Sequence, residues 1–210
     1  MNIKMETKKL YSLLAQLSYI VYLFEHLGYI HNDLHFGNIM YKAVPKTKTI
    51  KIFGQQVPTY GYLYKAIDYG DIKKINEKRS KYNDMSMIIS QLVDRQMSDS
   101  PIGEIYRSNK QDKMTPWNDI VKEIKKEPEY SSIKPYLTDK YEDTNWTIIT
   151  TMFYILNENR LCELLNIPKI LPEYKKYIGK KWIVPKEDVL YMISNIKNVK
   201  KIVKYFINKL

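Results

Sequence analysis

The chain has 210 residues, enough for one domain with a sizeable core, and its 44% hydrophobic and 27% charged residues exclude a disordered chain. The single cysteine, Cys162, excludes an internal disulfide framework and a cysteine-based metal site. A formal net charge of +11 would suit nucleic acid, phosphate groups or an anionic membrane, but lysine is spread along the whole chain. We therefore expect a lysine-rich solvated surface, with neither nucleic acid nor a membrane as partner.

The N-terminal residues, MNIKMETKK, contain no apolar segment of the kind found in signal peptides. The most apolar run, residues 10–27, is short for a membrane span and contains Gln16. We expect an intracellular protein without a transmembrane segment. The many tyrosines (19) and few glycines (7) are typical of an AT-rich genome, such as that of a large DNA virus.

The first predicted element is a long helix over residues 7–27. Thr7 is a suitable N-cap, and Gly28 is a suitable residue to follow the last turn. The apolar residues recur with the spacing of a stripe that faces a core, at positions 10, 13, 14, 17, 20, 21, 24 and 27.

A polar loop, HNDLHFGN, follows at residues 31–38. Residues 42–68 contain alternating stretches, prolines and glycines, which predict a small antiparallel hairpin system whose last strand ends at Asp68. DYGD at residues 68–71 predicts a turn. DMSMIISQLVDRQM at residues 84–97 predicts a second strong helix with Asp84 at or near its N-cap.

The rest of the chain predicts helices only, over residues 116–126, 145–157, 159–166 and 186–210, the last with a break near Asn195. The final stretch has apolar residues on one face and lysines on the other, and we favour packing on the domain over binding to a membrane. The expected fold class is mainly α with a small β hairpin element. We expect one domain over residues 1–210, with a catalytic core at 7–97 and a helical remainder at 98–210.

The loop can be written H-x-D-L-x-x-x-N, and thirty residues after Asn38 the chain reads I-D-Y-G. These motifs, in this order and between two apolar helices, resemble the protein-kinase-like phosphotransferases. The wording D-L-H-x-G-N-I is locally similar to the aminoglycoside and choline kinases of the same superfamily. The resemblance implies a protein-kinase-like C-terminal lobe, and ATP and Mg²⁺ as cofactors.

Phosphoryl transfer needs a positioned acceptor hydroxyl and neutralised phosphate charge more than covalent help from the protein. Asp33 matches the carboxylate that orients the hydroxyl and takes its proton. Asn38 and Asp68 match the ligands that hold Mg²⁺ against the ATP phosphates, since Mg²⁺ prefers oxygen donors. Gly70, also assigned to the cofactor site, would let the backbone turn sharply behind Asp68.

The two loop histidines have more than one interpretation. H-x-D-x-H is compatible with a zinc site, but only His26 remains as a further histidine. By resemblance, His31 braces the catalytic loop, while His35 could donate a hydrogen bond to the γ-phosphate with a charge that depends on pH. Asp84 matches the aspartate that holds the loop backbone in kinase-like proteins, although a plain N-cap would also explain it.

No Gly-rich phosphate loop and no strand lysine precede the first helix, so the resemblance implies a lobe that lacks the N-terminal lobe. Asn32 stands where many protein kinases have arginine, and residues 71–83 are short for an activation loop, which argues against control by phosphorylation there.

The expected function is an ATP- and Mg²⁺-dependent phosphotransferase, of serine/threonine protein kinase type, truncated or split. A catalytically inactive kinase-like binding module and a small-molecule kinase are the alternatives. The expected partners are ATP and a hydroxyl-bearing acceptor, either a protein or a small molecule. A separate chain that supplies the missing lobe, or self-association through the exposed surface, is a further partner expectation.

Overall fold

The computed structural model describes residues 3–75, 83–97, 115–137, 145–156, 158–164 and 184–210. The chain divides into two compact units, one formed by Met1–Ile88 with Ser194–Leu210 and the other by Ile89–Ile193. Unit 1 contains the predicted loop and is built around a long helix. Unit 2 is helical where it is described.

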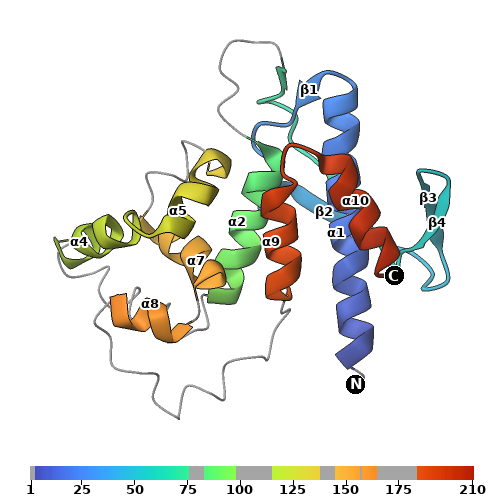
Figure 1. Cartoon of the computed structure of the whole chain (residues 1–210). Coiled ribbons are helices and arrows are strands. Elements are labelled where there is room, and N and C mark those ends of the chain that lie inside the picture. The colour runs from blue at the N-terminus through green and yellow to red at the C-terminus, as the bar shows by residue number, and fades with distance from the viewer. Residues whose placement is uncertain (1–2, 76–82, 98–114, 138–144, 157, 165–183) are drawn as a thin grey trace. The chain divides into compact units, whose positions relative to one another are not determined.

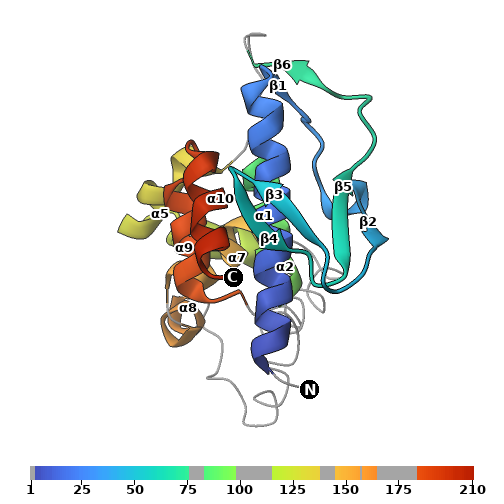
Figure 2. The ribbon, with the colours of Figure 1, turned by 90° about the vertical axis from the view of Figure 1, so that its right-hand side faces the viewer.

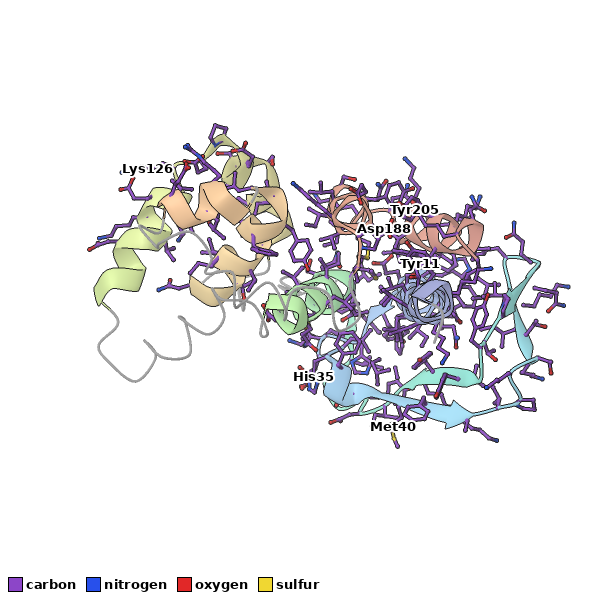
Figure 3. The ribbon with its side chains drawn as sticks, turned by 90° about the horizontal axis from the view of Figure 1, so that it is seen from below. Tyr11, His35, Met40, Lys126, Asp188 and Tyr205 are labelled. Atoms are coloured by element: carbon purple, nitrogen blue, oxygen red, sulfur yellow. The ribbon has the colours of Figure 1, made fainter. Side chains whose placement is uncertain are left out.

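Helix α1 (Ile3–His26) is the central element of unit 1 and begins four residues before the predicted helix. Helix α10 (Val199–Asn208) packs along it, as Figures 1 and 2 both show. The rings of Tyr11 and Phe206 lie 5.8 Å apart, and Tyr11 and Tyr205 both lie where the two helices meet (Figure 3). The apolar face of α10 is therefore buried against α1, as the favoured interpretation of this amphipathic stretch requires.

A two-stranded ribbon of β2 (Ile39–Ala43) and β5 (Tyr62–Ala66) runs along another side of α1 (Figure 2). The buried Gln16 side chain donates to the carbonyl oxygen of Tyr62 and accepts from the backbone N–H of Tyr64, both at 3.1 Å. An amide side chain of the helix thus satisfies the edge of β5 in place of another strand.

Between these strands lies the hairpin of β3 (Thr49–Ile52) and β4 (Gln55–Pro58). Its two turn residues, Phe53 and Gly54, both have positive φ angles of 46° and 84°, the signature of a type I′ turn. The Phe53 ring contacts those of Tyr19 and Tyr22 on α1, with centroids 5.4 and 4.9 Å away. These contacts offset the strain of an aromatic residue in the left-handed region.

The third ribbon pairs β1 (Tyr29–Ile30) with β6 (Lys73–Lys74) at the end of α1 farthest from the N-terminus (Figure 2). Tyr29 lies opposite Lys74 and Ile30 lies opposite Lys73. This pairing joins the entry to the loop 31–38 with the chain that leaves the DYGD turn.

Helix α2 (Asp84–Met97) crosses the boundary between the units. The other helices of unit 2 are α4 (Thr115–Ile124), α5 (Pro128–Ile133), the short 3-10 helix η2 (Lys134–Tyr136), α7 (Asn145–Ile155), α8 (Glu158–Leu164) and α9 (Lys186–Ser194). Helices α4, α7 and α8 contact one another. The sequence did not predict α5, because Pro128 suggested a break, whereas it occupies the first turn, where its missing N–H costs nothing.

The predicted fold class, mainly α with one small β element, is wrong. The described part of the chain is 57% helical and 16% strand, an α+β mixture with three two-stranded antiparallel sheets. The β1–β6 sheet was missed because strands of two residues carry no periodic signal. Of the predicted helical remainder, residues 98–114, 138–144, 157 and 165–183 lie outside the described residues.

Candidate active site

The carboxylate of Asp84 holds the loop 31–38 in place through two backbone hydrogen bonds. The backbone N–H of His31 donates to Asp84 Oδ2 at 2.8 Å, and that of Asn32 donates to Oδ1 at 2.9 Å. Asn32 has a positive φ of 67°, which asparagine tolerates better than most residues. One side chain on α2 therefore holds two consecutive amides of a loop more than fifty residues earlier.

Asp84 is free for this role because its neighbour caps the helix. Asn83 Oδ1 accepts from the backbone N–H groups of Met85 at 2.9 Å and Ser86 at 3.3 Å. The N-cap is thus Asn83 and not Asp84. Burial raises the pKa of Asp84, while the hydrogen bonds from His31 and Asn32 act in the opposite direction.

His31 is fully buried and ties the loop to the end of β5. Its Nε2 lies 2.9 Å from the carbonyl oxygen of Ile67, so this nitrogen carries the proton and donates. Its ring packs against those of Phe24 and Tyr69, with centroids 5.7 and 5.5 Å away, and these two rings also contact each other. In this position His31 braces the loop and is not accessible to a substrate.

Ile67 also joins the loop from its other side, because its backbone N–H donates to the carbonyl oxygen of Asn38 at 2.9 Å. Asp68 follows directly and has an exposed side chain and a positive φ of 63°. Gly70 has no positive φ, so the expectation that Gly70 makes the sharp turn is corrected: Asp68 adopts the left-handed conformation.

Asp33 and Asn38 face each other across the loop. Asn38 Nδ2 donates to the backbone oxygen of Asp33 at 2.9 Å and to its Oδ2 at 3.2 Å. Asn38 Oδ1 accepts no hydrogen bond from the described residues. The Asp33 side chain retains 27% of its exposure, so it is held in place but remains reachable from solvent.

His35 adds a second contact to Asp33. Its Nδ1 accepts from the backbone N–H of Gly37 at 2.9 Å, and its Nε2 lies 3.4 Å from Asp33 Oδ2. This geometry describes a neutral ring whose Nε2 proton faces the carboxylate, since Nδ1 acts as an acceptor. His35 therefore points at Asp33, and its expected hydrogen bond to the γ-phosphate stays a prediction.

Gly37 is a member of this arrangement that the sequence did not single out. A Cβ at this position would lie 2.6 Å from Cε1 and 2.8 Å from Nδ1 of His35, closer than real atoms approach. Only glycine leaves room for the ring to lie over the turn. A glycine two residues after a loop histidine was the available signal.

Glu25, at the end of α1, is a second residue that the sequence did not indicate. Burial and the nearby charge of Asp84 raise the pKa of Glu25 to about 7. Its closeness to Asp84 depends on a contact between distant parts of the chain, which no local pattern reveals.

The structure thus brings Asp33, His35 and Asn38 into direct contact, and connects His31, Asp84 and Asp68 to them through backbone groups. Across the described residues, no group of three or more His, Cys, Asp or Glu side chains is arranged to hold a metal ion, which leaves the zinc interpretation of the histidines without support. Similarly, none of the described helices combines the length and apolar character needed to cross a membrane.

Comparison of the chain with protein-family models, with curated proteins and with solved structures gives no match. The expected kinase C-terminal-lobe fold consequently has no structural relative to support it. Function has to be argued from the chemistry of the residues around the loop.

Proposed function

We propose that the chain is an ATP- and Mg²⁺-dependent phosphotransferase of the protein-kinase-like superfamily, of serine/threonine protein kinase type. The observation that carries the proposal is the anchored loop. Asp84 holds its backbone, Asn38 contacts Asp33, and Ile67 places Asp68 beside the same loop. These contacts support the roles that the motif resemblance implies for Asp33, Asn38 and Asp84.

Asp33 has the features of a base for an acceptor hydroxyl. The donors Asn38 Nδ2 and His35 Nε2 both approach Oδ2, which restricts the rotation of the carboxylate while it stays partly exposed. A carboxylate held in this way can orient a hydroxyl and accept its proton without losing side-chain entropy at that moment.

Asn38 and Asp68 fit a magnesium site by the chemistry of their donors. Asn38 Oδ1 accepts no hydrogen bond from the described residues, and the Asp68 carboxylate is exposed. Mg²⁺ commonly uses one or two such ligands together with substrate phosphates and water. When bound, the ion would neutralise the phosphate charge that develops during transfer.

The proposal is tested with the full chain by two measurements. Calorimetry with MgATP should detect nucleotide binding, which Asp68→Asn should weaken and Asp33→Asn should leave intact. Transfer of labelled γ-phosphate, to casein or to the chain itself, should fall at least about 100-fold in both variants. Asp71→Asn, in the same turn and also exposed, is the matched control and should change neither property.

A wild-type chain that shows no MgATP binding would contradict the proposal independently of the choice of acceptor.

One observation favours the alternative of a kinase-like binding module without catalysis: both Asn38 and His35 already occupy Asp33 Oδ2. That alternative predicts no nucleotide affinity and no effect of Asp68→Asn on any binding partner.

A further inference from the structure

An exposed apolar surface lies at the end of unit 1 that carries the β1–β6 sheet. Leu23 lies in the last turn of α1, Leu27 directly follows that helix, Tyr29 lies on β1, and Ile75 follows β6; all four are exposed, Leu27 to 70%. The N–H of Ile75 donates to the carbonyl oxygen of Gly28 at 2.9 Å, which joins the two segments. We call these four residues the α1–β6 patch.

The patch is not explained by the packing of the unit. α1 buries its core stripe against α10 and the β2–β5 ribbon, and Leu23 lies outside that stripe. The prediction that Leu27 belongs to the stripe is wrong, because Leu27 follows the last turn of α1 and is exposed. Single exposed apolar residues are ordinary, but a contiguous group of large ones marks a surface that is covered by a partner.

The charges around the patch indicate the chemistry of that partner. Lys73 and Lys74 flank the patch, both are exposed, and neither pairs with a carboxylate among the described residues. Tyr29 lies directly opposite Lys74 in the sheet register, so an aromatic ring and an ammonium group stand on neighbouring strands. A partner must offer both apolar side chains and negative charge.

The net charge of the chain points the same way once it is divided between the two units. Unit 1 contains 18 Lys and Arg against 7 Asp and Glu, whereas unit 2 contains 16 of each. The excess of +11 therefore belongs to unit 1 alone, even though lysine itself is spread along the chain. This concentration attracts an acidic partner to the unit that carries the patch.

The patch also adjoins the candidate active site. Lys73 is the register partner of Ile30, and Ile30 directly precedes His31. The ring of Tyr69 contacts Phe24 on α1 and His31 in the loop, so the DYGD turn lies against both of these elements. A chain bound across the patch would therefore lie next to the first residues of the loop that carries Asp33.

We propose that the α1–β6 patch with Lys73 and Lys74 docks an acidic polypeptide that has interspersed apolar residues, and that this polypeptide is the phosphate acceptor. The docking step stands on the exposed patch and the charge, while the acceptor role rests on the proposed phosphotransferase function.

The probe is a fluorescently labelled random copolymer of glutamate and tyrosine, whose binding to the full chain is followed by anisotropy. We expect wild type to bind it more tightly than poly-glutamate of the same length. Leu27→Ser should weaken binding about tenfold, because Leu27 is the most exposed member of the patch. Leu190→Ser, an exposed leucine of unit 2, is the control and should have no effect.

A matched pair of charge reversals separates local docking from the general field of the unit. Lys73→Glu/Lys74→Glu should weaken binding at least about tenfold, whereas Lys201→Glu/Lys204→Glu, an equal change on the exposed face of α10, should weaken it only about twofold. Equal losses in the two variants would overturn the docking site, as would equal affinity for poly-glutamate or equal competition by a DNA oligonucleotide.

A wild-type dimer in sedimentation that Leu27→Ser dissociates would also overturn the proposal, since a second copy would then cover the patch. Binding of the copolymer is also measured in the absence of ATP and in the Asp33→Asn variant, so that docking is separated from phosphate transfer. If the copolymer still binds but wild type transfers no phosphate to casein or to itself, docking stands and the phosphotransferase function falls.

Discussion

Two aspartates on the same helix, Asp84 and Asp94, show how differently a carboxylate inside a protein can be used. Asp84 is buried in unit 1 and accepts two backbone N–H groups from a distant loop. Asp94 lies in unit 2 and accepts from Thr150 Oγ1 at 3.0 Å, and burial raises its pKa to about 6. Asp84 organises backbone that would otherwise lack an acceptor, whereas Asp94 joins two helices by one side-chain contact. Substitutions that remove the same charge should therefore have opposite consequences.

The largest effect is expected for Asp84→Asn. The new amide NH₂ group faces one of the two loop N–H groups, which loses its acceptor in a buried place. We expect a loss of about 3 kcal/mol in the free energy of unfolding of unit 1. Amide hydrogen exchange at His31 and Asn32 should accelerate, and unchanged exchange would contradict the anchoring role.

Asp94→Asn should stabilise unit 2 at neutral pH, since Asn keeps an oxygen for Thr150 but carries no buried charge. The folded-state pKa of Asp94 is above its ordinary value of 3.8, so the folded state binds the proton more tightly and wild-type stability falls as pH rises from about 4 to about 6. We expect a gain of about 1–2 kcal/mol above pH 6 and a loss of this pH dependence. All three tryptophans, Trp117, Trp146 and Trp182, belong to unit 2, so their fluorescence in urea reports on it selectively.

Gly37→Ala tests the packing of the His35 ring over Gly37 in the loop 31–38. The added methyl group would lie 2.6 Å from the His35 ring, so the ring must leave Gly37 and Asp33. We expect about 1 kcal/mol lower stability. His35→Asn is the matched variant, because its shorter amide can still cap Gly37 N–H but cannot reach Asp33. A stable His35→Asn with lowered kcat and unchanged KM for ATP would assign the Asp33 contact to catalysis rather than folding.

The smallest effect is expected at Glu25, where the pKa is raised to about 7 by burial and by Asp84. Wild-type stability should fall as pH rises from 4.5 to about 7, because the protonated form is favoured in the folded state. Glu25→Gln should remove this slope and stabilise unit 1 at pH 8 by about 1 kcal/mol, after allowance for solvent screening. The check is circular dichroism in urea at pH 5 and pH 8, and equal slopes in both proteins would contradict it.

Much of the local structure could be predicted from the sequence, because helices with an apolar stripe carry a long periodic signal. The helix expected over residues 84–97 has those bounds, and the one expected over 7–27 is α1, which begins four residues earlier and ends one residue earlier. The fold class could not be predicted in this way. The β1–β6 sheet joins residues more than forty positions apart, and its strands are too short to show alternation of apolar and polar residues.

The same limit applies to the site. The spacing of polar residues indicated Asp33, Asn38 and Asp68. The packing of the His35 ring over Gly37 and the closeness of Glu25 to Asp84 arise only from three-dimensional contacts. The sequence also did not show where the backbone adopts positive φ angles. These occur at Asn32, Phe53, Tyr60 and Asp68 as well as at glycines.

The capping of α2 by Asn83 makes the loop sensitive to how that helix is wound. Successive residues of an α-helix point about 100° apart, so a slip of one residue at the start of α2 would swing Asp84 away and present an asparagine or a methionine to His31 and Asn32. Asn83 closes the first turn and so sets the rotational phase of the helix. Any ligand or modification that unwound this single turn would release the loop carrying Asp33 without touching it.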